Sequence, residues 1–598
     1  NVRQAHQLQQ NLLVAPRPPA APKVTTVELD REIILEWGSD SSRVAQTEQA
    51  ILPGGYRFEG YNVYQLLDVS SSLKDGVKIA TFDVVNTVQN IVDEEIDANT
   101  GLVVPVVRQR GTDSGIRRHF RITKDYLSES DPGLLTNGKT YVFAVTAYNY
   151  AEATHPRSLE SSPQIVTVRP RVPADLVISS SYGDTLPVSH PEGSADAVIV
   201  PLVVDPTAGT GDTYEIRFTV SATDMLWSWT NTSKGITLLS NQPLPSPEKP
   251  SVTVDGVQLT ITNPSAGFKN FLVVANAAGP LATPEIGCFA FNDNGFPFWN
   301  NTDRPSEAQQ VGPGKWGIHT GMCPSDGSFF YFVYRVTQAG YLWPRIVPYD
   351  FEIRFTAAGG FGYAPNFFVS GSSVGGTLMN VPFELWNTGI NTPDDASDDY
   401  RLFPYLIDHD GDGEFGLARI DHSVSGGDDD PETDWFYWVL PVNKSPGTAG
   451  YDAIVAAIQP NPSAHMYLDP VVMEWEIMRR MVLVNWNGGS VSDPAWPANV
   501  DQPMPEQGTI FRITTQKVIT AGDVYTFMIP SPLRGPEVEK AGAARIRIYP
   551  NPYYAFTEGG LVTGTPVVTF NNLPRKVKIR IFNLAGHHVR TLEKDNTS

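Results

Sequence analysis

Short runs rich in β-branched and aromatic residues, with apolar and polar side chains in alternation, recur along the whole chain. Examples are EIILEW at residues 32–37, YNVYQLL at 61–67, YVFAVTAY at 141–148 and KIRIFNL at 578–584. Apolar residues at alternate positions lie on one face of an extended strand. The pattern predicts an all-β protein with several immunoglobulin-like β-sandwich domains in series.

Glycine and proline interrupt these runs throughout, with 50 Gly and 49 Pro among 598 residues. Both residues disfavour the interior of a helix, so the composition favours short strands joined by turns. The chain is also longer than one hydrophobic core supports, and about three to five domains are expected.

Residues 1–23 form a polar tail that ends in a Pro/Ala-rich linker, and the first domain spans residues 24–170. In this domain Trp37 ends an alternating strand, a tyrosine-rich strand follows, and Tyr141 comes directly after LLTNGKT. These features resemble a fibronectin type III domain, in which Tyr141 takes the place of the corner tyrosine. The resemblance implies a sandwich that acts as a spacer or binding scaffold, with an insertion at residues 71–115.

The central region, residues 171–540, is rich in predicted strands and contains one short internal repeat. The sequence EIRFT occurs at residues 215–219 and again at 352–356. Two related sandwiches would produce such a repeat, and so would two unrelated strands of similar patterning. One or two sandwiches are therefore expected in this region.

The last segment, residues 541–598, contains YPNP at 549–552, NLP at 572–574 and IFNLAGHHVRTL at 581–592. These motifs resemble the C-terminal immunoglobulin-like modules of secreted and cell-surface bacterial proteins, including the sorting domains of type IX secretion. The resemblance implies an exported protein that is extracellular or attached to the cell surface. The closing strands of such modules have no counterpart before Ser598, so an incomplete sandwich with unpaired strand edges is expected.

The alternating pattern after NLP predicts a strand with one solvent-exposed face and one buried face. Its alternating residues are Lys576, Val577, Lys578, Ile579, Arg580 and Ile581. An incomplete sandwich can be completed by residues missing from this chain or by a strand lent by a neighbouring copy, for which the tail, residues 1–23 with its apolar NLLV, is the candidate. Such lending predicts head-to-tail self-association, which generates filaments when the contacts do not close.

The charge of the chain excludes two classes of partner. With 65 acidic and 44 basic residues, the net charge is −21, so nucleic acids and anionic membranes would be repelled. No apolar run reaches the length of about 18 residues that a membrane-spanning helix needs, and no membrane span is expected.

One acidic stretch has the spacing of a calcium-binding loop. Asp408, Asp410 and Asp412 occupy alternate positions, and Gly413 follows them at the sixth position of the loop. Calcium prefers oxygen ligands in this arrangement. Arg419 stands where such a loop requires a bidentate glutamate, so the motif is partial and the remaining oxygens must come from elsewhere.

The predicted calcium ligands are Asp408, Asp410, Asp412 and Glu414, and Phe415 fills the hydrophobic position of the loop. The surrounding segment, residues 394–434, contains 12 Asp and 2 Glu against 2 Arg. A bound Ca²⁺ would relieve the repulsion among these carboxylates, and a fully solvated acidic loop is the alternative. The candidate outer ligands are Asp394, Asp395, Asp398, Asp399, Asp428, Asp429 and Asp430.

Two cysteines, Cys288 and Cys323, are separated by a Gly- and Pro-rich stretch. In an oxidising compartment they are expected to form a disulfide, whereas a reducing compartment would leave two thiols.

Several motifs of catalytic type lack the context that their chemistry needs. Glu474 and Glu476 would lie on the same face of a strand. Two solvent-exposed glutamates are therefore a simpler interpretation than the catalytic pair of a glycosidase. GLLTNGKT at 133–140 has the spacing of a phosphate loop but precedes a strand, and GSSVG at 371–375 lies in a Gly/Ser-rich loop with no strand-to-helix turn. The aromatic run at 434–441 could stack on sugars or fill a core.

The sequence therefore favours a non-enzymatic extracellular structural protein that self-assembles into a surface layer or filament, with a calcium-stabilised loop. An adhesin that binds polysaccharide or another surface is the first alternative. A secreted hydrolase with an unrecognised catalytic domain is the second.

Overall fold

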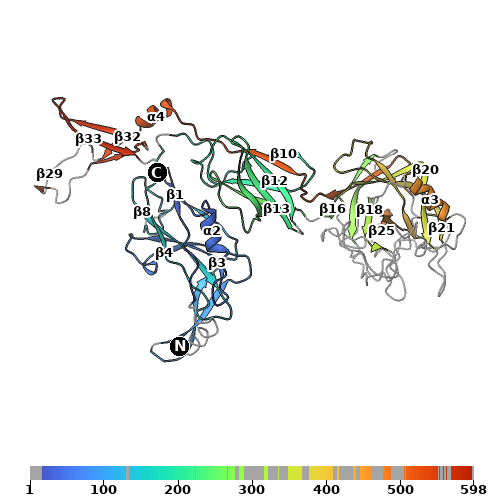
Figure 1. The fold of residues 1–598 in the computed structure, drawn as a ribbon, viewed down its shortest axis with the longest axis horizontal. Helices are drawn as coiled ribbons and strands as arrows, with labels where there is room; N and C mark the ends of the chain where they lie inside the picture. Colours follow the sequence, from blue (N-terminus) through green and yellow to red (C-terminus); the bar gives the residue numbers. More distant parts are fainter. Residues whose placement is uncertain are drawn as a thin grey trace. The chain divides into compact units, whose positions relative to one another are not determined.

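The computed structural model contains short strands in several separate sheets and three described helices (Figure 1). The prediction of an all-β fold with several β-sandwich domains is confirmed. The structure describes residues 16–97, 99–129, 133–173, 176–221, 224–264, 267–275, 282–288, 315–320, 334–335, 348–365, 376–407, 414–416, 435–439, 445–458, 476–485, 504–505, 507–549, 551, 556–557, 560–561, 568–574 and 576–595.

The chain divides into two compact units, and the second is inserted into the first. Residues 1–193, 198–262 and 520–598 form the first unit, and residues 194–197 and 263–519 form the second. The three described helices are α2 (Ser41–Glu48), α3 (Ala449–Ile458) and α4 (Pro536–Ala543).

The first sandwich follows the N-terminal linker. Its strands, in spatial order, are β1 (Thr25–Leu29), β2 (Glu32–Glu36) and β7 (His119–Ile122) in one sheet, and β4 (Val77–Asp83), β3 (Arg57–Leu66), β8 (Tyr141–Tyr150) and β9 (Gln164–Val168) in the other. Trp37 and Tyr61 are fully buried between the sheets and meet edge to face, with ring centroids 5.6 Å apart. The Tyr141 hydroxyl accepts the backbone N–H of Thr136 at 2.8 Å and so fixes the turn before β8.

A hairpin of two strands, β5 (Asn90–Ile96) and β6 (Val103–Arg110), lies within the segment predicted as an insertion and forms a sheet of its own. We call it the insertion hairpin. One of its faces is bound to the first sandwich: the side chains of Gln109 and Asn62 exchange hydrogen bonds, and His155 Nδ1 lies 2.8 Å from Asp93 Oδ1.

The second sandwich shows how the second unit is inserted. Its strands are β10 (Val188–Glu192), β27 (Val524–Met528), β12 (Thr213–Ser221), β13 (Asp224–Asn231) and β14 (Ile236–Pro243) in one sheet, and β11 (Val198–Val203) and β15 (Val257–Thr262) in the other. Strand β27 pairs with β10 and β12 although more than 260 residues separate it from β15 in the chain. The last strand of this sandwich, β27, therefore follows the second unit in the sequence.

One buried arginine joins the first sandwich to the second. The side chain of Arg118 is 3% exposed, and its Nε and Nη2 donate to the two oxygens of Glu48, at the end of α2, at 2.6 and 2.7 Å. Its Nη1 donates to the backbone carbonyls of Pro250 and Ser251, at 2.7 and 3.2 Å. The Tyr61 hydroxyl also donates to Glu48, at 2.8 Å. The guanidinium therefore has partners in both sandwiches.

His119 extends this joint. Its Nδ1 lies 2.7 Å from the Tyr182 hydroxyl and its Nε2 lies 3.2 Å from Gln258 Oε1. Burial lowers the pKa of His119 to about 4, so the ring is neutral at physiological pH and one nitrogen can accept while the other donates.

The second unit is built around one large sheet. Its strands in spatial order are β16 (Gly267–Ala275), β26 (Ile510–Gln516), β20 (Phe351–Pro365), β23 (Tyr405–Ile407), β24 (Trp435–Val439), β25 (Glu476–Asn485), β18 (Lys315–Thr320) and β17 (Ala282–Cys288), with β21 (Gly376–Asn387) and β22 (Tyr400–Leu402) attached beside β20 and β19 (Tyr334–Arg335) beside β25. Lys517 is buried here beside Asp350 and donates to the carbonyl of Thr515 at 2.9 Å. Burial lowers the pKa of this ammonium group.

The two EIRFT repeats occupy similar positions in the two units. Each lies in a strand, β12 or β20, that pairs with the next strand on one side and with a strand from residues 510–528 on the other. In each repeat the Ile and Phe side chains are buried, and the arginine donates to the preceding glutamate at 2.6 Å. The short repeat therefore encodes the same strand geometry twice.

Replacing Arg118 by alanine should lower the free energy of unfolding by about 3–5 kcal/mol, because Glu48 would remain buried without its partner. Urea denaturation of the full chain, followed by tryptophan fluorescence, measures the loss. Arg121→Ala is the matched control, because Arg121 is 48% exposed and its ion pair with Glu32 should contribute less than about 1 kcal/mol. Equal losses in the two variants would contradict the role of Arg118.

Candidate functional site

The predicted calcium loop connects two neighbouring strands of the second unit. Strands β23 and β24 are antiparallel, with Ile407 opposite Trp435, so the two residues that flank the segment 408–434 lie side by side. Asp408, Asp410 and Asp412 lie outside the described residues, and the predicted ligand set stays a prediction.

The described part of the loop is anchored by Phe415. This side chain is buried and packs edge to face on Phe383, with ring centroids 5.2 Å apart, while Phe383 also contacts Phe436 at 5.0 Å. The neighbouring Glu414 is exposed. Phe415 is thus buried as expected for the hydrophobic position of the loop, whereas a loop of this kind uses the backbone carbonyl, not the side chain, at the position of Glu414.

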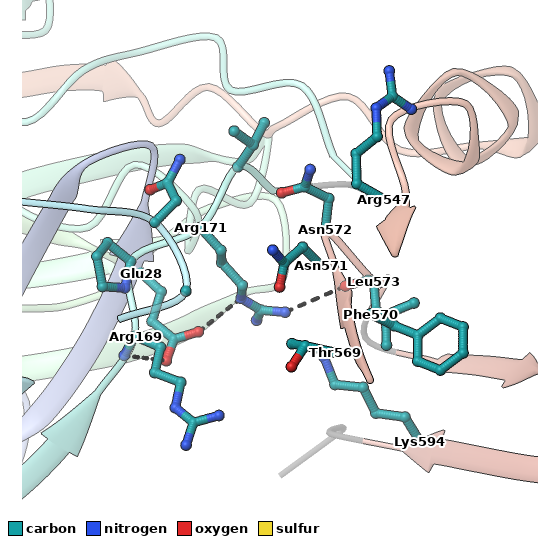
Figure 2. Close-up of a pocket in the computed structure, with 14 residues that line it drawn as sticks. Glu28, Arg169, Arg171, Arg547, Thr569, Phe570, Asn571, Asn572, Leu573 and Lys594 are labelled. Atoms are coloured by element: carbon teal, nitrogen blue, oxygen red, sulfur yellow. Dashed lines mark hydrogen bonds and ion pairs between the residues drawn. The ribbon is translucent and has the colours of Figure 1, made fainter. Parts of the chain in front are cut away.

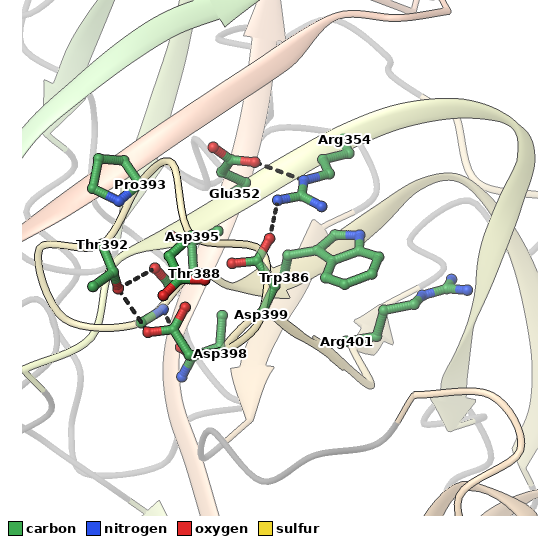
Figure 3. Close-up of polar contacts among 12 residues, drawn as sticks. Glu352, Arg354, Trp386, Thr388, Thr392, Pro393, Asp395, Asp398, Asp399 and Arg401 are labelled. Carbon is green, nitrogen blue, oxygen red and sulfur yellow. Dashed lines mark hydrogen bonds and ion pairs between the residues drawn. The ribbon is translucent and has the colours of Figure 1, made fainter.

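Three of the candidate outer ligands already have partners within the protein (Figure 3). Asp398 accepts the hydroxyl of Thr392 at 2.7 Å, and Asp395 accepts the backbone N–H of Ser397 at 3.0 Å and its hydroxyl at 2.6 Å. The hydrogen bonds from Ser397 lower the pKa of Asp395. These carboxylates shape the turn between β21 and β22.

Asp399 belongs to an ion-pair network at the start of β20. Arg354 donates to Asp399 at 2.7 Å and to Glu352 at 2.6 Å, and Arg512 donates to the other oxygen of Glu352 at 2.7 Å (Figure 3). The Arg354 guanidinium lies 4.4 Å from the centre of the Trp386 ring, a cation–π contact. Within the described ranges, no group of three His, Cys, Asp or Glu side chains is placed to hold a metal ion.

The other residues that the sequence singled out are placed as follows. Cys288 ends β17, and Cys323 lies outside the described residues, so the disulfide stays a prediction.

The segment 133–140 leads into β8 rather than a helix, which removes the context of a phosphate loop. In the aromatic run, Phe436 is fully buried in the core of the second unit. Glu474 and the segment 371–375 lie outside the described residues.

No known protein family, characterised protein or solved structure matches this chain. The fibronectin type III and sorting-domain resemblances therefore rest on the sequence motifs alone. In the part of the chain that the structure describes, no helix is both long and apolar enough to span a lipid bilayer.

The C-terminal module has several exposed large apolar side chains, among them Tyr549, Phe582 and Val589. Its strands are β28 (Arg547–Tyr549), β29 (Phe556–Thr557), β30 (Gly560–Leu561), β31 (Thr569–Asn571), β32 (Lys576–Phe582) and β33 (His588–Asp595). They pair only in twos, as β28 with β31, β29 with β30 and β32 with β33. Among the described residues of 541–598, no apolar side chain is buried.

The pair β32 and β33, which we call the terminal hairpin, has the predicted alternation but not the predicted buried face. Val577, Ile579 and Ile581 are only half-buried, and among the described strands no third strand pairs with this two-stranded sheet. Ile579 stands opposite Leu592, while Ile581 and Val577 stand opposite Arg590 and Lys594. One face of the hairpin is therefore an apolar stripe with a cation at each end.

A pocket of about 490 Å³ lies beside this module within the first unit (Figure 2). Arg171 is central to it: its Nε lies 2.7 Å from Glu28 Oε2, and its Nη1 is 3.5 Å from the carbonyl oxygen of Leu573. Arg171 is thus paired with Glu28, and three more cationic side chains, Arg169, Arg547 and Lys594, also line the pocket.

Calcium binding at residues 408–414 predicts that a chelator lowers the melting temperature of the wild-type chain by about 5 °C, since saturation at about a hundred times the dissociation constant adds roughly 2.7 kcal/mol. Asp410→Ala should remove this sensitivity. Asp395→Ala should retain it, because Asp395 is bound by Ser397. Identical melting curves of the wild type with and without chelator would contradict the site.

The disulfide prediction is tested by mass spectrometry of peptides from non-reduced protein secreted into an oxidising medium. A cross-linked peptide that contains Cys288 and Cys323 is expected, because both cysteines of an exported chain meet an oxidising compartment. Alkylation of both thiols without prior reduction would refute the bond.

Proposed function

We propose that this chain is a non-enzymatic, extracellular structural protein that assembles head to tail with copies of itself. The observation that carries the proposal is the uncovered apolar surface of the C-terminal module. Tyr549, Phe582 and Val589 are all exposed there, and no described residue of the module forms a buried apolar core.

Physical chemistry favours a partner for these strands. A two-stranded hairpin is at best marginally stable alone in water, and it becomes stable when its apolar face packs against another layer. Its two outer strand edges also keep unpaired backbone groups that can pair with a further strand. A second protein layer over this module would satisfy both demands.

The distribution of charge favours another copy of this chain as the partner. Residues 541–598 contain eight Lys and Arg against three Asp and Glu, whereas the rest of the chain contains 36 Lys and Arg against 62 Asp and Glu. Two C-terminal modules would repel each other, but one module and the acidic remainder of a neighbour would attract. This asymmetry favours a head-to-tail contact over a symmetric dimer.

The sequence motifs supply the cellular context of the proposal. The fibronectin-like motifs around Trp37 and Tyr141 and the sorting-domain-like motifs after Ala544 are typical of secreted and cell-surface proteins. The buried joint at Arg118 would carry load between successive sandwiches without requiring a flexible linker. Calcium at the acidic loop would lower the repulsion between neighbouring copies.

Sedimentation velocity and electron microscopy of the full chain test the proposal. We expect assemblies that grow with protein concentration and that weaken by at least about tenfold in apparent affinity when salt screens the attraction. A chain that remains monomeric at every concentration, at both low and high salt, would refute the assembly function.

A further inference from the structure

The insertion hairpin has a second, uncovered face. Cross-strand pairing places Val92 opposite Val107, Glu94 opposite Pro105, and Ile96 opposite Val103 on this face. Ile96 is 71% exposed and Val103 is 62% exposed. The opposite face is the one that is bound to the first sandwich through Asp93 and Gln109. The hairpin therefore presents an apolar face with one carboxylate at its centre.

The terminal hairpin matches this face in size. Strands β5 and β6 have 7 and 8 residues, and strands β32 and β33 also have 7 and 8 residues. Each hairpin is a two-stranded sheet of its own with one apolar face, which is exposed in the insertion hairpin and half-buried in the terminal hairpin. Two sheets of equal length can pack face to face at about 10 Å and bury both faces together.

The two faces are also complementary in charge. Glu94 lies among the apolar residues of the insertion hairpin, and Arg590 and Lys594 lie at the ends of the apolar stripe of the terminal hairpin. Over whole hairpins, residues 90–110 contain four Asp and Glu against two Arg, while residues 576–595 contain five Lys and Arg against two Asp and Glu. Packing of one on the other would bring opposite charges together.

We propose that the terminal hairpin of one copy packs on the insertion hairpin of the next copy, so that their apolar faces form a small intermolecular sandwich. This inference rests on the proposed function and names the surface that receives the C-terminal module. The contact uses different surfaces on the two copies, and repetition of it generates an open filament unless the rotation between copies closes a ring.

The N-terminal tail is the competing occupant of the terminal hairpin. Residues 1–20 contain two Arg and no Asp or Glu, so this tail has the same sign of charge as the C-terminal module. Like charges disfavour that contact, and the acidic insertion hairpin is the better complement.

A charge-reversal experiment on the full chain tests the contact. Glu94→Arg and Arg590→Glu should each raise the protein concentration needed for assembly by about tenfold, and the two together should restore it to within about threefold of the wild type. Glu152→Arg is the control, because Glu152 is an exposed carboxylate of the first sandwich outside the hairpin. Circular dichroism checks that each variant folds.

Replacement of an apolar side chain by a polar one tests the contact in a way that does not depend on charge. Ile96→Ser should also raise the assembly concentration by about tenfold, since it removes apolar area from the contact. Ile51→Ser should leave assembly unchanged, because Ile51 is equally exposed, at 77%, but lies outside the insertion hairpin.

The outcomes separate this inference from the proposed function. If the wild type assembles and all hairpin variants assemble equally well, the contact is wrong and the proposed function stands. If deletion of residues 1–20 abolishes assembly while Glu94→Arg and Ile96→Ser do not affect it, the tail is the occupant and the contact is overturned. If the wild type never assembles, both fail.

Discussion

The buried guanidinium of Arg118 is the interaction on which the arrangement of the first two sandwiches depends. A charge taken out of water costs several kcal/mol unless its donors are satisfied, and Arg118 achieves this only when Glu48 and the carbonyls of residues 250 and 251 are all in place. Helix α2, the start of β7 and a loop of the second sandwich are therefore fixed by one side chain. The neutral ring of His119 adds a second polar link beside it.

Local patterning identified the strands because alternation is a property of a few consecutive residues. The runs that contain Trp37, Tyr61 and Tyr141 became β2, β3 and β8 and their flanks, and the repeated EIRFT became two similar strands. The nesting of the second unit could not be read in this way. It depends on the pairing of β27 with β12, and nothing in the five residues of β27 specifies a partner so distant in the chain.

For the acidic segment, the number of carboxylates said less about their role than the groups that bind them. The acidic segment around residues 394–434 predicted a surplus of metal ligands, yet Asp395, Asp398 and Asp399 serve the local turn and the network of Arg354. The arginine partner of Asp399, Arg354, comes from β20, which lies outside the segment, so a count within the segment cannot reveal it. Similarly, alternation in β32 predicted which face is apolar, but whether that face is covered depends on elements outside the strand.

Self-association of a chain with a net charge of −21 requires that local attraction exceed the repulsion between whole copies. At physiological ionic strength the screening length is about 8 Å, so charges far from a contact contribute little, whereas charges within it act at nearly full strength. The sign of the C-terminal module then matters more than the net charge of the chain. Under the proposed function, the basic terminal hairpin of an otherwise acidic molecule would be attracted to a copy at one place and repelled elsewhere, which would select one mode of contact.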